Sequence, residues 1–541
     1  MTGDRTPARP VRLFGDSAVV VDVATVDEAH AVAAALDERA EPGVEDVIVG
    51  YRSVTVVTDP TVTDVSALAE ALMAAEPSGA AAPTGNLVEI PVAWDGSDLG
   101  EVARIAGMSP ERVVTLLTEA DLRVAFVGFA PGFAYLVGLD PALAAVPRRS
   151  TPRTAVAGGS VGLAGGFVGI YPRTSPGGWQ LVGRTDMPLF DPSAPPYSAL
   201  QPGDRVRVRI ADLGDDGGSA PSPAARPRLH SVGDRRVEVE EAGLLSFVQD
   251  RGRLGAARLG VPRAGAADPY ALRLANGLVG NHERCAGIEV TARGPALRFT
   301  APVHAAVVGV CDVSVDGRSV PTETIVPIDT GQTMTTGALR EGMRAYIAVG
   351  GGIEIPAVLG SRSSDVLCGL GPGPLVRGDT LGIGPPGRPR GRVRRSSLSP
   401  DTVVLRVMLG PDVFPPATVE RLVSTTWEVD PSSNRIGVRL HGGTPLPASG
   451  PVTGSRGMVT GAIQLPPDGR PIALLCDHAT VGGYPVIATV VSADLGALGQ
   501  LRPTDAVRLE TVDLIEASQA RAGREREIKD GVVGWYPVRT D

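Results

Sequence analysis

The first 76 residues alternate between short apolar runs and segments with helical spacing of their apolar positions. SAVVVDV and the two apolar runs of DVIVGYRSVTVVTD predict strands, whereas VDEAHAVAAALDERA and VSALAEALMAA predict amphipathic helices. The resulting β-α-β-β-α order is typical of a small split βαβ, ferredoxin-like unit. We therefore expect an α+β domain over residues 1–85.

From Leu87 onward, short strands separated by Gly and Pro turns replace this alternation. LVEIPVAW, LRVAFVGF and QPGDRVRVRI predict strands, and a helix is indicated between them by Ser109 at an N-cap followed by Pro110. Many short strands with regular turn signals predict a closed barrel or a sandwich. We expect this β domain to cover residues 86–212.

The remainder of the chain is again rich in strands. A Gly/Ser/Pro-rich linker at residues 213–234 precedes a first lobe, 235–385, and a second linker at 386–400 precedes a second lobe, 401–541. The clearest helix of the first lobe is DPYALRLANGLVGN, with Asp268 at its N-cap. The pattern thus predicts a mainly β protein with an α+β N-terminal domain.

Composition limits the classes of function. The 541 residues carry a formal net charge of −9, which gives no electrostatic support for binding nucleic acid. The sequence shows no apolar leader and no run approaching the ~18 apolar residues of a membrane span. The four cysteines form no CxxC pair or Cys/His cluster, so we expect a cytoplasmic protein without a structural zinc. A homo-oligomer is compatible with this composition.

Lysine is almost absent, because Lys529 is the only one in the chain. A P-loop and a biotin attachment site each need a lysine in a defined context, and the charged segment EREIKDGV suits neither. Any bound phosphate or carboxylate is therefore expected to contact arginines and backbone N–H groups.

The segment GGSVGLAGGFVGIYPRTSPGGW, residues 158–179, contains eight glycines among strand-forming apolar residues. Glycine lets backbone N–H groups approach an oxyanion, and arginines lie before, within and after the run. One hypothesis is a rim that binds phosphate or carboxylate; the alternative is that the glycines only form tight barrel corners. The candidate residues are Arg153, Gly158, Gly159, Ser160, Arg173, Gly177, Gly178 and Arg184.

Two loops of the C-terminal half, VQDRGR and CDHATVGGYP, carry acids that could act in catalysis. Asp250 and Asp477 are candidates for a general base or for metal carboxylates, and His478 could move a proton near neutral pH. The alternatives are turn-capping aspartates and a hydrogen-bonded structural histidine. The sequence does not identify metal ligands. Further candidates for substrate binding are Arg251, Arg253, Ser361, Arg362, Gln464, Thr480 and Tyr484.

Several longer motifs resemble one protein family. GFAPGFAYL, AGGSVGLAG and LVGRTDMPLFD resemble the B component of prokaryotic 5-oxoprolinase, formerly regarded as part of allophanate hydrolase. VQDRGRLGAARLGVPRAGAADPYALRLANGLVGN and GAIQLPPDGRPIALLCDHATVGGYPVIATVV resemble the C component of the same enzyme. Both halves are also similar to the carboxyltransferase region of urea carboxylase. The chain thus resembles a natural fusion of a B half and a C half.

The resemblance implies cyclophilin-like β-barrels, one in the B half and two in the C half. It implies ATP-dependent opening of 5-oxo-L-proline to L-glutamate with a separate A component, the complex binding ATP with Mg²⁺. Two other functions stay open: a carboxyltransferase acting on a biotinylated partner, and a regulator that binds a histidine kinase. The family pattern has histidine, tyrosine and glutamine where this chain has Leu117, Leu122 and Ala479.

Overall fold

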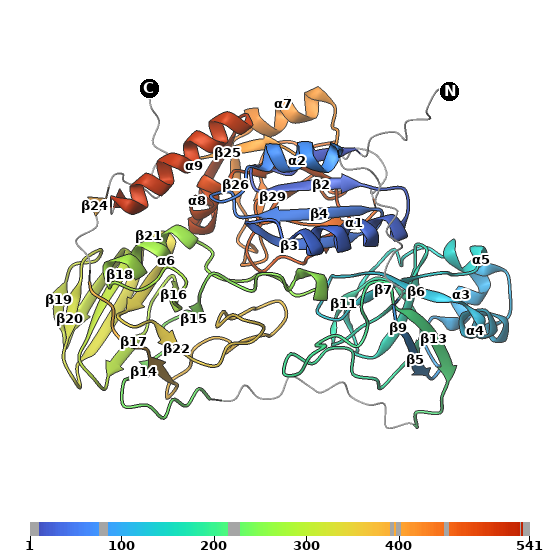
Figure 1. Cartoon of the computed structure of the whole chain (residues 1–541), viewed down its shortest axis with the longest axis horizontal. Helices are drawn as coiled ribbons and strands as arrows, with labels where there is room; N and C mark the ends of the chain where they lie inside the picture. The colour runs from blue at the N-terminus through green and yellow to red at the C-terminus, as the bar shows by residue number, and fades with distance from the viewer. Residues whose placement is uncertain are drawn as a thin grey trace.

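The structure is a computed structural model that describes residues 10–74, 85–214, 228–389, 394–395, 402–447, 454–530 and 532–533. Both predicted linkers, 213–234 and 386–400, lie largely outside the described residues. The described chain forms an α+β N-terminal domain and three barrel-like β units (Figure 1). This confirms the mainly β fold predicted from the sequence.

The N-terminal domain is a four-stranded sheet in the order β1-β2-β4-β3, with two helices packed on it. The predicted β-α-β-β-α elements all form, and a short strand that the pattern did not predict, β1, pairs with β2 at the edge. The elements are β1 (Val11–Leu13), β2 (Ala18–Asp22), α1 (Val26–Arg39), β3 (Val44–Gly50), β4 (Ser53–Thr58) and α2 (Val65–Ala74).

The rest of the B half is a seven-stranded barrel, in which an isolated bridge between Ala93 and Arg184 joins the two edges of the sheet. Ser109 caps α4 as predicted, because its side chain accepts a hydrogen bond from the Arg112 N–H at 3.3 Å. The strands are β5 (Leu87–Val92), β6 (Leu122–Val127), β7 (Ala134–Val137), β8 (Arg153–Val156), β9 (Ser160–Ala164), β10 (Phe167–Ile170), β11 (Ser175–Gly177), β12 (Gln180–Arg184) and β13 (Arg205–Ile210). The helices are α3 (Leu99–Ala106), α4 (Pro110–Glu119) and α5 (Pro141–Ala144).

The first lobe of the C half is a ten-stranded sheet that carries one long helix, α6. Asp268 is the N-cap of α6, as predicted, and accepts a hydrogen bond from the Ala271 N–H at 3.0 Å. The strands are β14 (Arg236–Glu241), β15 (Leu245–Gln249), β16 (Gly287–Thr291), β17 (Ala296–Phe299), β18 (Val303–Val315), β19 (Arg318–Val320), β20 (Val326–Ile328), β21 (Thr333–Val349), β22 (Ile353–Glu354) and β23 (Thr380–Ile383). The helices are η1 (Ala257–Leu259) and α6 (Pro269–Leu278).

The second lobe is a closed seven-stranded barrel, and a long C-terminal helix, α9, runs from it toward α6 (Figure 1). Its strands are β25 (Thr402–Leu409), β26 (Trp427–Val429), β27 (Gly437–His441), β28 (Arg456–Gly457), β29 (Ala462–Gln464), β30 (Ile472–Leu474), β31 (Val481–Gly482), β32 (Val486–Val490) and β33 (Ala506–Thr511). Its helices are α7 (Pro416–Ser424), η2 (Ser492–Asp494), α8 (Leu495–Gln500) and α9 (Leu514–Lys529), and β24 (Arg394–Arg395) pairs with β34 (Val532–Val533).

The B-half barrel and the C-terminal barrel share one topology. Their strand orders, β5-β13-β6-β7-β10-β9-β12 and β25-β33-β26-β27-β30-β29-β32, match position by position. The first and last strands pair in parallel in both, and each barrel carries a small two-stranded sheet, β8–β11 or β28–β31. The end of the glycine-rich segment, residues 171–179 with β11, and the CDHATVGGYP loop with β31 therefore lie at equivalent places in two related barrels.

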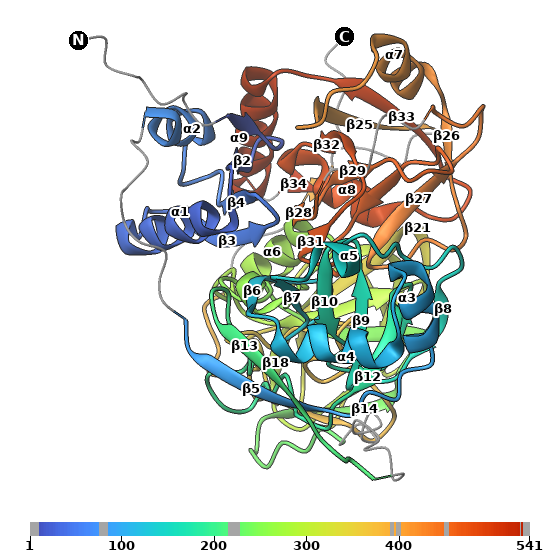
Figure 2. The same cartoon turned by 90° about the vertical axis from the view of Figure 1, so that its right-hand side faces the viewer.

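The N-terminal domain packs against the C half as well as against its own barrel (Figure 2). The Tyr51 N–H donates to the Ser455 carbonyl at 2.6 Å, and β3 contacts β28, β6 and η1. Apolar side chains of this domain, of the B-half barrel and of two C-half segments form one continuous buried cluster. The described helices include none with the length and apolar character needed to span a membrane.

Candidate functional site

A cavity of about 240 Å³ lies where the N-terminal domain, the first lobe and the C-terminal barrel meet. We call it the junction cavity. Glu45, Asp46 and Asp59 line it from the N-terminal domain, and loops of the C half contribute Arg251 and His478. Alanine, proline, leucine and methionine side chains cover much of the remaining wall. A pocket of this kind, mainly apolar with convergent polar groups, is the usual form of a small-molecule site.

A β-bulge places two consecutive acids of β3 at this cavity. Val44 pairs with Thr58 and Asp46 pairs with Val57, so Glu45 is an extra residue in the strand. Side chains of an unbroken strand alternate between faces, whereas a bulge redirects them. Both carboxylates consequently line the junction cavity.

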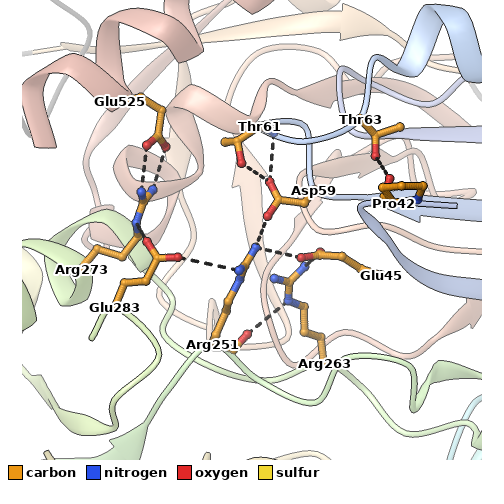
Figure 3. Close-up of polar contacts among 10 residues, drawn as sticks. All are labelled: Pro42, Glu45, Asp59, Thr61, Thr63, Arg251, Arg263, Arg273, Glu283 and Glu525. Carbon is orange, nitrogen blue, oxygen red and sulfur yellow. Dashed lines mark hydrogen bonds and ion pairs between the residues drawn. The ribbon is translucent and has the colours of Figure 1, made fainter. Parts of the chain in front are cut away.

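Arg251 joins the N-terminal domain to the first lobe (Figure 3). Its guanidinium donates to Glu45 at 3.0 Å and to Asp59, and lies 4.0 Å from Glu283 of its own lobe. Arg263 adds a second ion pair to Glu45 at 2.6 Å. Acids from the B half are thus neutralised by arginines from the C half.

The carboxyl of Asp59 is held in its ionised form. Burial alone would raise its pKa, but hydrogen bonds from Thr61 and Arg251 outweigh burial and lower the pKa below its usual value. Farther along the same wall, Arg273 of α6 pairs with Glu525 of α9 at 2.7 Å and with Glu283 at 3.0 Å (Figure 3). Ion pairs therefore tie together all the parts that surround the cavity.

Asp250 lies at the edge of the cavity with its carboxylate already bound by the protein. It accepts hydrogen bonds from the N–H groups of Gly252 at 2.8 Å and Arg362 at 2.7 Å, and from the hydroxyls of Ser361 and Ser363. The loop of Ser361, Arg362 and Ser363 therefore binds the side chain of Asp250. A role for Ser361 and Arg362 in substrate binding stays a prediction. That Asp250 acts as a general base stays a prediction.

Asp477 is fully buried in an ion-pair cluster beside the cavity. Arg435 donates to its two carboxylate oxygens at 2.9 and 3.0 Å and also to Glu289 and to the Gly265 carbonyl. The Val366 N–H completes the contacts of Asp477 at 3.2 Å. The cluster places Asp477 as a structural partner of Arg435, and its catalytic role stays a prediction.

His478 and Thr480 line the cavity from the loop before β31. The Nδ1 atom of His478 lies 2.8 Å from the Ala479 carbonyl, so the N–H of the neutral ring is assigned to Nδ1 and Nε2 is left as an acceptor. Burial lowers the pKa of this imidazole below its ordinary value. The Thr480 hydroxyl is buried without a hydrogen-bond partner among the described residues. Both groups are suited to bind a polar ligand.

Three other predicted residues of the C half do not line the junction cavity. Arg253 is fully buried and donates to the Ser363 carbonyl, and its Nε and Nη1 have no partner within the described residues. The Gln464 amide lies 3.3 Å from the Met458 sulfur, and Tyr484 is 43% exposed. A role for these three in binding stays a prediction.

Three glycines of residues 158–179, Gly162, Gly169 and Gly177, pack against aromatic rings. A Cβ on Gly169 would come within 2.8 Å of Phe133 and Trp179, and one on Gly177 would meet the Tyr171 ring at 2.8 Å. The Phe133 ring contacts those of Tyr171 and Trp179 edge-on, with centroids 5.2 and 5.6 Å apart. Aromatic packing is therefore a third use of these glycines, besides the two considered from the sequence.

Each arginine around the glycine segment already has a partner within the protein. Arg153 pairs with Asp98 at 2.8 Å, Arg184 pairs with Asp95 at 2.7 Å, and Arg173 donates to a backbone carbonyl of the first lobe. Gly158 and Gly159 form the turn before Ser160, where β9 begins. Arg153 and Arg184 each bind an acid of the same barrel, so neither guanidinium is free of a protein partner. Phosphate binding here stays a prediction.

Neighbouring glycines allow a direct test of the packing role. We expect Gly177→Ala to lower the unfolding free energy by roughly 1–3 kcal/mol, because its methyl group would overlap the buried Tyr171 ring. Gly178→Ala meets only Pro152, at 3.6 Å, and is expected to change stability by less than about 0.5 kcal/mol. Urea unfolding followed by near-UV circular dichroism measures both, and equal midpoints for the two variants would contradict the packing role.

Sequence reasoning missed the contribution of the N-terminal domain to the cavity. In the sequence pattern, Glu45, Asp46 and Asp59 are ordinary polar positions around strands, and Arg263 is part of a loop. The one available signal was the pair of adjacent acids at the start of an otherwise apolar strand, GVEDVIVG, which suits a bulge better than a regular pleat.

Comparison with known proteins defines the class. The family described as "Carboxyltransferase domain, subdomain C and D" matches residues 10–200, and "Carboxyltransferase domain, subdomain A and B" matches residues 259–511. The solved structure of a protein designated TTHA0988 is 34% identical, with a TM-score of 0.83 over 93% of this chain and 100% of that chain. The fold is thus that of a protein with both pairs of carboxyltransferase subdomains.

The relatives of each half identify the family. The C half is 33% identical over 303 residues to the C component of 5-oxoprolinase from Escherichia coli, covering 54% of this chain and 96% of that protein. The B half is 36% identical over 226 residues to the B component of 5-oxoprolinase from Bacillus subtilis, covering 37% of this chain and 93% of that protein. Urea amidolyase of Saccharomyces cerevisiae is 31% identical over 328 residues, 17% of its length and 54% of this chain. The chain belongs to the family of the 5-oxoprolinase B and C components and carries the regions of both in one polypeptide.

Proposed function

We propose that the chain is the combined B and C component of a 5-oxoprolinase, which opens 5-oxo-L-proline to L-glutamate with ATP and a separate A component. The observation that carries the proposal is that the junction cavity needs both halves. Its acids Glu45, Asp46 and Asp59 come from the B half, and Arg251 and His478 come from the C half. A fusion of the two regions fixes this shared site within one polypeptide.

The size and chemistry of the cavity support a small polar substrate. Its 240 Å³ is below the ~300–1,000 Å³ of pockets that bind drug-sized molecules, which suits a single five-membered lactam. His478 offers an acceptor nitrogen to such a ligand, and Thr480 offers a hydroxyl that has no partner among the described residues. Opening a lactam requires that the amide be oriented and that a proton be transferred. A rigid cavity wall orients the amide.

The same cavity fits a nucleotide poorly. A nucleoside triphosphate is far larger than the lactam, and every arginine on the wall is paired with an acid. Among the described residues, no group of three or more His, Cys, Asp or Glu side chains is placed to hold a metal ion. ATP would supply phosphoryl activation of the lactam. We propose that its site is in the partner or at the contact with it, and we assign no step of nucleotide chemistry to this chain.

Reconstitution tests the proposed function. The chain is mixed with a homologue of the 5-oxoprolinase A component, ATP, Mg²⁺ and 5-oxo-L-proline, and glutamate and ADP are measured. We expect both products in equal amounts from the mixture and neither from either protein alone. A mixture that forms no glutamate at any ratio of the two proteins would overturn the proposal.

A carboxyltransferase is the second candidate, favoured by the similarity to urea amidolyase and urea carboxylase. Lys529 is the only lysine of the chain, and it lies in a charged segment of α9, so biotin would have to come from a partner. Bicarbonate-dependent turnover with carboxybiotin, in place of glutamate formation, would favour this function.

A further inference from the structure

We propose that Asp46 is the carboxyl group that exchanges a proton with the substrate in the junction cavity, an assignment that rests on the proposed function. Asp46 belongs to the N-terminal domain, whereas His478, which could also move a proton, lies in the C half. The inference therefore assigns a chemical role to a domain whose residues carry none of the motifs recognised in the sequence.

The first support is the placement of the side chain. The bulge at Glu45 turns two successive carboxylates toward the cavity, which a regular strand could not do. Bulges are frequent beside active sites, where they redirect a side chain. Only 7% of the surface of Asp46 is exposed and its side chain lines the cavity, so a ligand in the cavity can reach a carboxyl that bulk solvent barely contacts.

The second support is the contrast between the two acids. Glu45 accepts from Arg251 at 3.0 Å and from Arg263 at 2.6 Å and is held in two ion pairs. Asp46 accepts from the backbone N–H of Ala257 at 3.1 Å, and in the described part of the chain no basic nitrogen lies within 4.0 Å of it. Two neighbouring carboxyls in such different surroundings take different roles, one as a fixed charge and one as an acid or base.

Charged groups of both halves face Asp46. Arg263 lowers the pKa of Asp46 and Glu45 raises it, and Arg251, Asp59 and His478 line the same cavity. Burial is the largest influence and raises the pKa of Asp46 to about 6, which the Ala257 N–H and Arg263 only partly oppose. A carboxyl with a pKa near the working pH is present in both forms and can both accept and return a proton.

The proposed step uses both forms in turn. As a water oxygen bonds to the ring carbonyl carbon, the Asp46 carboxylate takes a proton from that water. As the C–N bond breaks, the same proton passes to the ring nitrogen, which leaves as an amine. The Asp46 carboxylate is regenerated, one water is consumed, and the ring is open. With the phosphoryl group from ATP on the former ring carbonyl oxygen, the opened product is an acyl phosphate, and a second water releases phosphate to give glutamate. The cavity residues Arg251 and Arg263 keep Glu45 out of this exchange by holding it as an ion pair.

The test compares Asp46→Asn with the wild-type chain in the reconstituted assay between pH 5 and 8.5. We expect the wild-type kcat to rise through pH about 6, as the base form appears. In Asp46→Asn, kcat is expected to fall at least ~100-fold with KM changed less than about threefold, and the pH step should vanish. Asp46→Glu should recover part of kcat and restore a pH step.

The matched control is Asp64→Asn, the same substitution at an exposed aspartate of the same domain outside the cavity wall. It should keep wild-type kcat and the wild-type pH profile. An Asp46→Asn variant that keeps kcat within about threefold, or loses kcat but retains the pH step, overturns the role of Asp46 while the proposed function stands. A wild-type chain that forms no glutamate with the A component overturns the proposed function, and the role of Asp46 with it.

Discussion

Replacing Arg435 with methionine is expected to destabilise the C half by about 3–5 kcal/mol, the cost of leaving buried charges without their partner. The Arg435 side chain is only 5% exposed, and it neutralises Glu289 and Asp477, both fully buried. Burial would raise the pKa of Glu289, but Arg435 and Arg344 outweigh it and keep the carboxyl ionised. Urea unfolding measures the loss of unfolding free energy. A variant too unstable to accumulate as folded protein would show the largest loss.

Arg205→Met is the control for this prediction. Arg205 pairs with Asp121 on the surface, where the two side chains are 56% and 77% exposed, so its loss is expected to cost less than ~1 kcal/mol. Neutralising the stranded acids should also recover stability, so the triple variant Arg435→Met, Glu289→Gln, Asp477→Asn is expected to be more stable than Arg435→Met alone. If Arg435→Met were no more costly than Arg205→Met, the cluster would not be the structural centre that its burial indicates.

The elements that local physics determines were predictable from the sequence. Ser109 and Asp268 cap α4 and α6 because a side-chain oxygen before a proline-started helix satisfies a free N–H regardless of the rest of the fold. The mainly β fold and the family were likewise predictable, because short sequence motifs carry both signals. The comparisons with known proteins confirm both predictions.

The partners of charged groups were not predictable in the same way. The sequence singles out Asp250 and Asp477 as candidate catalytic acids, but what each one contacts depends on residues more than 40 positions away, such as Ser361 and Arg435. Arg435 itself lies in the unremarkable segment NRIGVRL. Neither hydrophobic periodicity nor turn chemistry predicts which loops contact each other in the fold. Those contacts determine whether a carboxylate has hydrogen-bond or ion-pair partners.

The packing of the N-terminal domain against both halves could not be predicted from the sequence, for a related reason. The pattern of β3 fixes which side chains face the core, but it does not indicate that the end of the strand meets the C half. The same holds for Gly169, which has room for no side chain because the rings of Phe133 and Trp179 pack against it, and Phe133 lies outside the glycine-rich segment. A site built between domains is visible only once the domains are placed together.

The pH dependence of stability is expected to reveal Asp46 without any assay of activity. Burial raises the pKa of its carboxyl from 3.8 to about 6, so the folded chain holds this proton more tightly than the unfolded chain does. The associated stability is fully present below the unfolded pKa, about 3.8, and is lost as the pH rises through about 6, amounting to roughly 3 kcal/mol. Asp365, whose pKa is raised to about 6 by burial and then by Asp477, is expected to behave alike.

Comparing variants separates the contribution of Asp46 to the pH dependence of stability from the contributions of the other titrating groups. Asparagine carries no proton to lose, so Asp46→Asn should gain about 2 kcal/mol relative to the wild-type chain between pH 4.5 and pH 7.5. The measurement is the urea-unfolding free energy at both pH values, with Asp64→Asn as the surface reference. Asp365→Asn should show a similar gain in unfolding free energy. If the two sites are independent, the gain of the double variant is expected to equal the sum of the gains of Asp46→Asn and Asp365→Asn. A constant difference between Asp46→Asn and the wild-type chain across this range would show that the carboxyl is ionised throughout, and would remove the proton on which its proposed role depends.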